Sequence, residues 1–189
     1  FVVVDLRGSQ MQRSSAPQEE LNRADDDLFT VVRAIKVQSP NAPLILLGRS
    51  LHSPRLLGLL RGAKIQGVYI IEGTGLSATD LEKCGLNCCR GVLVFSTAAT
   101  TDFDRSDTQA LITTSSVNEI IRRTHPVPDA VHVVTDTRHL DALELLPPMF
   151  SEDVMTRKAH DNFFFQPSFI TGRSVCDIML DQTLYQAFF

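Results

Sequence analysis

The chain has 189 residues and a formal net charge of −4 at pH 7, and this negative charge argues against nucleic acid as its main partner. Hydrophobic residues make up 43% and charged residues 21%, a balance typical of a globular domain with a buried core and not of a disordered chain. No apolar run is long enough to span a bilayer. The four cysteines lack the spacing of a disulfide framework, which predicts reduced thiols in an intracellular compartment.

In the first half of the chain, short apolar runs alternate with segments whose apolar residues recur at helical spacing. The runs predict buried strands, and the periodic segments predict amphipathic helices. Ser77 and Asp80 match a capping box, which marks the start of a short helix. The expected strands are 1–6, 43–48 and 67–71, and the expected helices are 19–37, 52–61 and a short one from Ser77 to Cys84.

The same alternation continues in the second half. A second capping box, Ser174 and Asp177, predicts that the last helix begins at Ser174. The expected strands are 91–95, 130–134 and a sixth that begins at 163–165, and the expected helices are 106–123, 138–146 and 174–189.

This order of elements predicts the fold class. Strands that alternate with helices and are apolar on both faces are typical of a parallel sheet covered on both sides. We therefore expect an α/β fold in one domain: a Rossmann-like, doubly wound, mostly parallel six-stranded sheet with helices on both faces. The unbroken apolarity of strand 1–6 places it at the centre of the sheet.

The motifs that bind nucleotides in such folds are missing. The first strand leads to a single glycine, Gly8, where a dinucleotide site needs G-x-G-x-x-G. Gly73 and Gly75 form a lone G-x-G after the third strand, with no acid about 20 residues further on to hold a ribose. We read this pair as a tight strand-to-helix turn and predict that NAD, NADP and ATP do not bind.

Catalytic and zinc-binding patterns are also missing. No G-x-S-x-G nucleophile turn occurs, and His132 is expected to be a core or face residue of its strand. Cys84, Cys88 and Cys89 lack the paired C-x2-C spacing of structural zinc sites, so we expect them to pack a turn before the fourth strand.

Clusters of acidic residues give the candidate cation sites. Asp25–Asp27 are expected to open a helix, where negative charge is favourable. Asp102, Asp104 and Asp107 follow the fourth strand, at the edge where α/β sheets bind ligands. Their carboxylates are ligands for a hard cation such as Ca²⁺, and this loop is the candidate metal site.

Three stretches together resemble an RCK domain (regulator of potassium conductance), and most closely the second RCK domain of the Slo family of calcium- or sodium-activated potassium channels. The C-terminal stretch resembles that family's "QPF-x-x-G" strand and "LD-x-L-x-x-x-x-F" helix, and its Leu-Tyr-Gln-Ala-Phe ending is most similar to the sodium-activated branch. The stretches are Ile70–Leu81 with Val92–Ser96, Thr101–Asp107, and Phe165–Arg173 with Met179–Phe188.

The resemblance implies a regulatory role without enzymatic activity. It implies a tetrameric gating ring of RCK domains on the cytoplasmic side of a membrane, which couples intracellular Ca²⁺ or Na⁺ to opening of a pore in another part of the channel. The resemblance implies no tightly bound cofactor. It implies that Ca²⁺ or Na⁺ is the regulating ion. The chain is then one N-terminal lobe, 1–189, with its crossover helix at 174–189, cut from a longer channel. The apolar residues expected to contact a partner domain are Val175, Ile178, Met179, Leu184, Tyr185 and Phe188.

One loop departs from the family pattern. The calcium-activated branch carries a dense aspartate run before the "QPF" strand, whereas here only Glu152 and Asp153 remain, opposed by Arg157 and Lys158. Because Ca²⁺ takes six to eight oxygen ligands, this loop is the poorer cation site. Two other readings stay open: a nucleotide-binding regulator of the bacterial potassium-uptake type, and a Rossmann-like enzyme.

Overall fold

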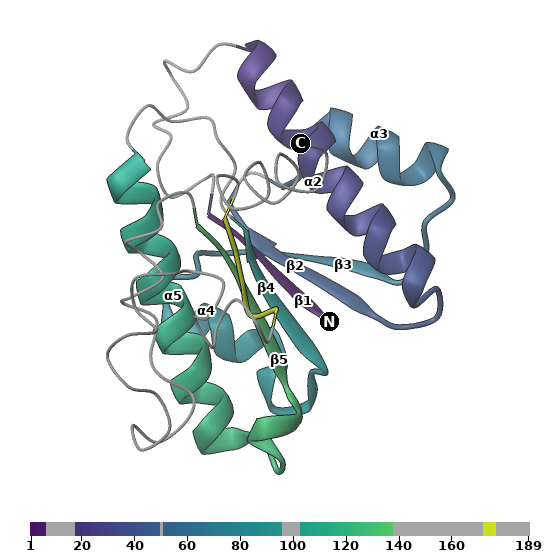
Figure 1. Ribbon diagram of the computed structural model, residues 1–189. Coiled ribbons are helices and arrows are strands. Elements are labelled where there is room, and N and C mark those ends of the chain that lie inside the picture. The colour runs from purple at the N-terminus through teal and green to yellow at the C-terminus, as the bar shows by residue number, and fades with distance from the viewer. Residues whose placement is uncertain (7–17, 50, 96–102, 138–171, 177–189) are drawn as a thin grey trace, which may run out of the picture.

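The computed structural model describes residues 1–6, 18–49, 51–95, 103–137 and 172–176 (Figure 1). Within these ranges six parallel strands form one sheet in the order β3-β2-β1-β4-β5-β6, which confirms the predicted Rossmann-like fold. The strands are β1 (Val2–Asp5), β2 (Leu44–Gly48), β3 (Val68–Glu72), β4 (Gly91–Phe95), β5 (His132–Thr137) and β6 (Ser174–Cys176).

Helices cover both faces of this sheet (Figure 1). The helices are α2 (Gln18–Gln38), α3 (Pro54–Gly62), α4 (Ala78–Lys83) and α5 (Phe103–Thr124), and two short 3₁₀ turns lie at Leu86–Cys88 and Pro128–Ala130. Strand β1 lies between β2 and β4, and its side chains alternate between two cores. Val3 packs with α2 and α3 on one face, whereas Val2 and Val4 pack with α4 and α5 on the other.

The prediction that a helix begins at Ser174 is wrong for its first three residues. Ser174–Cys176 form strand β6, which pairs with Thr135–Thr137 of β5. The amide of Thr135 also bonds the carbonyl of Arg173, so sheet pairing outweighs the local capping preference of Ser174. The rest of that predicted helix, the strand expected at 163–165 and the helix expected at 138–146 lie outside the described residues.

Two groups of candidate acidic residues lie elsewhere in their helices than predicted. Helix α2 starts at Gln18, so Asp25–Asp27 lie in its interior and do not open it. Helix α5 starts at Phe103, which places Asp104 and Asp107 on the helix and not in the loop before it. Strand β5 begins at His132, slightly later than predicted.

Candidate functional site at the carboxyl ends of the strands

All six strands run parallel, so their carboxyl ends meet at one edge of the sheet. At this edge β1 ends with Asp5, which is buried, and β2 ends with Gly48, which packs against it: a Cβ on Gly48 would lie 3.1 Å from the Cβ of Asp5. Ligands of open α/β sheets bind at such an edge. A ligand site in this fold would therefore lie among the loops and helix starts around this edge.

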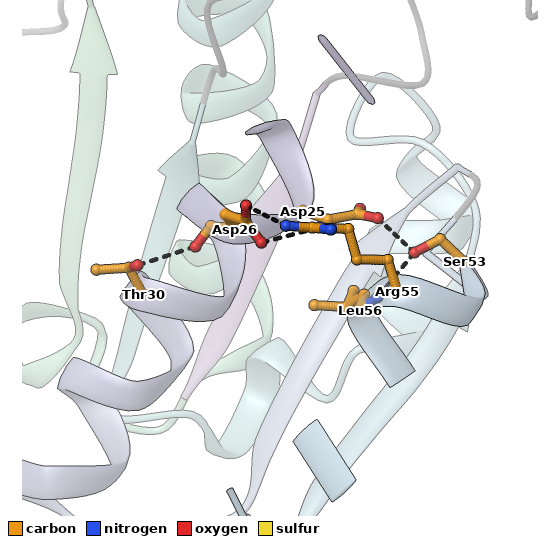
Figure 2. A network of polar contacts seen from close by, with 6 residues as sticks. All are labelled: Asp25, Asp26, Thr30, Ser53, Arg55 and Leu56. Atoms are coloured by element: carbon orange, nitrogen blue, oxygen red, sulfur yellow. Dashed lines mark hydrogen bonds and ion pairs between the residues drawn. The ribbon is translucent and has the colours of Figure 1, made fainter. Parts of the chain in front are cut away.

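A polar network joins α2 to the start of α3 (Figure 2). The hydroxyl of Ser53 donates to Oδ2 of Asp25 at 2.5 Å and accepts from the amide of Leu56 at 3.0 Å, which makes Ser53 the N-cap of α3. Asp25 is only 7% exposed, so this hydroxyl is a valuable partner for a carboxylate that is largely removed from water. One serine thus caps α3 and ties it to α2.

Beside this contact, Asp26 and Arg55 form a two-pronged ion pair (Figure 2). Nε of Arg55 donates to Oδ1 of Asp26 at 3.0 Å, and Nη2 donates to Oδ2 at 2.6 Å. The hydrogen bonds from Arg55 lower the pKa of Asp26, and those to Asp26 raise the pKa of Arg55. Both side chains are 46% exposed, so water and salt screen the pair. The contact orients the two helices more than it stabilises them.

The turn between β3 and α4 is built from its own side chains, as predicted for the lone G-x-G. Oδ2 of Asp80 accepts from the amide of Thr74 at 3.2 Å, and Ser77 caps α4 through the amide of Asp80. A Cβ on Gly73 would lie 2.9 Å from Cγ of Asp80. The hydrogen bond from Lys83, followed by that from the amide of Thr74, lowers the pKa of Asp80. An ionised carboxylate therefore lies where a phosphate would need to approach the turn.

The predicted cation ligands are only partly described. Asp102 lies outside the described residues, and of Asp104 the backbone alone is described, in the first turn of α5. Asp107 is three residues further along the helix and 4% exposed. Among the described side chains no group of three or more His, Cys, Asp or Glu residues could hold a metal ion. Helix α5 was predicted to start at Ser106 but starts at Phe103. The partial positive charge at its N-terminus disfavours a nearby cation.

Two of the three neighbouring cysteines pack the turn before β4, as expected. Cys84 and Cys89 are buried in the core between the sheet and α5, but Cys88 is exposed, which corrects the prediction for that residue. Burial raises the pKa of the Cys84 thiol to about 12 and also raises the pKa of Cys89. Both buried thiols are therefore protonated at neutral pH and are poor metal ligands.

His132 lies on the surface, which agrees with its predicted place on a strand face. Its Nε2 is 3.2 Å from the carbonyl oxygen of Gly172, a contact that joins the start of β5 to the residue pair before β6. Of the predicted partner-contacting residues only Val175 is described, half-buried in β6 opposite Asp136. The other five, Ile178, Met179, Leu184, Tyr185 and Phe188, lie outside the described residues.

A second polar contact, which the sequence did not predict, lies between α5 and β5. The hydroxyls of Thr114 and Thr135 are both buried and 2.7 Å apart. Among the described residues, the neighbouring hydroxyls of Thr113, Thr137 and Ser174 are buried and have no hydrogen-bond partner. The network around Ser53 was missed too, although a serine directly before a proline at a helix start is a readable N-cap signal.

The sheet order and the helices on both faces define a Rossmann-like α/β domain. A comparison with protein families matches residues 12–150 to the calcium-activated potassium channel slowpoke-like RCK domain. The match covers more than half of the chain, so the chain belongs to this family of channel domains, which are regulatory and not enzymatic. No curated protein matches the chain. Among the described helices, none has both the length and the hydropathy needed to cross a bilayer.

Proposed function

We propose that this chain is part of a gating ring that couples intracellular Ca²⁺ or Na⁺ to the opening of a potassium channel. The observation that carries the proposal is the match of residues 12–150 to the slowpoke-like RCK domain. The parallel sheet with β1 at its centre supports it, as does a β3–α4 turn that holds its own carboxylate in place of a phosphate. The ring would lie on the cytoplasmic side of the membrane and would assemble from RCK domains of the same tetrameric channel.

Within such a channel we assign the chain to the second RCK domain. This finer assignment rests on the stretch from Phe165 to Phe188, which resembles the second domain and follows the matched segment. The proposed contact with a partner RCK domain is the apolar set Val175, Ile178, Met179, Leu184, Tyr185 and Phe188.

For direct ion binding we favour Asp102, Asp104 and Asp107 over Glu152 and Asp153. The first group follows β4 at the ligand edge of the sheet, whereas the second has Arg157 and Lys158 beside it. Burial of Asp107 and the start of α5 at Phe103 both weaken the first group as a strong site.

The test is electrical and uses the intact channel. Potassium currents are recorded from excised patches while Ca²⁺ or Na⁺ is varied on the cytoplasmic side. We expect the open probability to rise with one of these ions. A potassium current that does not change with either ion would contradict the proposed coupling.

A paired substitution then separates the two candidate loops. Asp102→Ala with Asp104→Ala is compared with Glu152→Ala with Asp153→Ala, and we expect a reduced ion response only in the first pair. Loss in the second pair alone would reverse the assignment of the loop. An unchanged response in both pairs would move the sensor out of these segments while leaving the regulatory role intact.

A further inference from the structure

The start of helix α3 combines a Ser-Pro sequence with a charged network that a phosphate would rearrange. The chain contains two Ser-Pro pairs, Ser39-Pro40 and Ser53-Pro54, and no Thr-Pro pair. Ser53 has φ −65° and ψ 139°, an extended conformation that the following proline favours. His52, Pro54 and Arg55 are accessible to solvent, and Ser53 itself is half-buried. The serine therefore lies in a short, extended and accessible segment.

We propose that Ser53 is a phosphorylation site for a proline-directed protein kinase, and that its phosphate uncouples α3 from α2. In the reaction, the Ser53 hydroxyl oxygen attacks the γ-phosphorus of Mg-ATP and forms the new P–O bond. The bond to the β-phosphate breaks and ADP leaves, while the hydroxyl proton passes to the kinase's catalytic base. This inference does not depend on which ion the channel senses.

Access to the hydroxyl needs only a local opening. Ser53 contacts α2 through Asp25, and the neighbouring ion pair between Asp26 and Arg55 is half exposed and screened by water. Contacts of this kind open more easily than the core beneath them. The first turn of α3 can therefore release Ser53 to a kinase without unfolding the sheet.

Phosphorylation would exchange the partners of the whole network. The phosphate carries about −1.5 to −2 charges at pH 7 and three acceptor oxygens, which suit the N-terminus of α3. It removes the proton that Ser53 donates to Asp25 and places negative charge against that buried carboxylate. It also offers Arg55, two residues away, a stronger acceptor than Asp26. Helix α3 keeps its cap, while Asp25 and Asp26 of α2 both lose these contacts with α3.

The other Ser-Pro pair provides a natural comparison within the same chain. Ser39 follows the end of α2, and its amide donates to the carbonyl of Ile35. A phosphate there would lie at the negative end of the helix, which disfavours it. Pro40 is followed by Asn41, so this pair also lacks the arginine that follows Pro54. The physical argument therefore favours Ser53 and disfavours Ser39.

The experiment treats the intact purified protein with Mg-ATP and a mitogen-activated protein kinase, which is proline-directed. Phosphopeptides are identified by mass spectrometry, and backbone hydrogen exchange is measured before and after the reaction. We expect phosphate on Ser53 and not on Ser39. We also expect exchange in residues 22–30 to accelerate by roughly fivefold or more, the effect of losing about 1 kcal/mol of local stability.

Three variants control this result. Pro54→Ala keeps the serine and its cap but removes the kinase's recognition element, so incorporation at residue 53 should be lost. Ser53→Ala removes the acceptor. Arg55→Gln releases Asp26 in advance, so phosphorylation should then accelerate exchange in α2 by less than in the unaltered protein. Absence of phosphate on Ser53, equal incorporation at Ser39, or phosphorylation with unchanged exchange in α2 would each overturn the proposal.

Discussion

Gly75 lies between Val4 of β1 and Thr113 of α5, in the turn that the sequence marks as G-x-G. A Cβ at this position would lie 2.7 Å from Cγ1 of Val4 and 2.8 Å from Cγ2 of Thr113, which is too close for either contact. Packing therefore requires glycine here, and this close approach accounts for the second glycine of the motif without a bound nucleotide.

We expect Gly75→Ala to lower the free energy of unfolding by roughly 1–3 kcal/mol, because the strand or the helix must move. Gly58→Ala is the matched control, because Gly58 lies in α3 and no atom of the described residues lies within 4 Å of the position that a Cβ would take. This variant should gain up to about 1 kcal/mol from helix propensity. Urea denaturation of both variants measures the two changes in the free energy of unfolding, which should have opposite signs. Equal effects would show that packing around Gly75 is looser than described.

Cys84 predicts a dependence of stability on alkaline pH. Burial raises the pKa of this thiol from 9.0 to about 12, so the folded state holds its proton more tightly than the unfolded chain does. The stability it contributes is complete below about pH 9 and is lost progressively as the pH rises towards 12, because only the unfolded chain ionises there.

The measurement is the free energy of unfolding across this alkaline range. Cys84→Ala should fall less steeply with pH than the unaltered chain, because one titrating group that differs between the two states is gone. Gly58→Ala is the control, since it removes no titrating group and should leave the slope unchanged. A slope that is the same in all three proteins would contradict the burial of the Cys84 thiol.

At the level of elements, the buried hydroxyls of Thr114 and Thr135 link α5 to β5. Thr114→Val removes one partner and leaves the hydroxyl of Thr135 buried without this hydrogen bond, which should cost about 1–3 kcal/mol. Replacing both threonines by valine should recover most of this loss, because neither hydroxyl is then left without the other. Denaturation of the two single variants and the double variant measures the coupling.

The neighbouring residue supplies a matched control on the same helix. Within the part of the chain that the structure describes, the buried hydroxyl of Thr113 has no hydrogen-bond partner. Thr113→Val therefore removes an unsatisfied group and should be neutral or stabilising. If Thr113→Val and Thr114→Val cost the same, the contact between Thr114 and Thr135 contributes nothing specific.

The elements that could be predicted are those whose signal is local. Val2–Val4 read as a central strand because a strand buried on both faces has no polar alternation, and the sheet has β1 between β2 and β4. Helix α2 was predicted to within one residue at each end, since its apolar residues recur at helical spacing. Ser174–Cys176 could not be predicted, because pairing with β5 outweighs a capping box that is intact in the sequence.

The candidate site shows more clearly that contacts between distant segments could not be predicted from local sequence patterns. Ser53 and Asp25 are 28 residues apart, and only the packing of α3 against α2 brings them together. The acidic run Asp25–Asp27 was interpreted as a helix start, whereas two of its members bind the start of a different helix. Local patterns give the cap and the charge, but the pairing depends on tertiary structure.

At the level of the whole molecule, the described core leaves few large apolar side chains in water. Most buried apolar residues belong to the two clusters on either side of the sheet. The C-terminal segment lies outside the described residues. In the helix that the sequence predicts there, apolar positions would occupy more than one face: Ile178, Met179, Leu184, Tyr185 and Phe188. Such an arrangement predicts both a core side and a side that contacts another protein surface.

We therefore expect Tyr185→Ser combined with Phe188→Ser to weaken assembly of the intact channel and to reduce its response to the activating ion. Burial of an aromatic side chain at an interface is worth several kcal/mol when it is central, so the loss should be large enough to shift the oligomer towards smaller species. Mass photometry of the purified channel measures the assembly, and patch recordings measure the response. Tyr185→Phe with Phe188→Leu preserves the apolar surface and should behave like the unaltered channel. Full assembly and gating in the serine variant would mean that this segment packs only against its own domain.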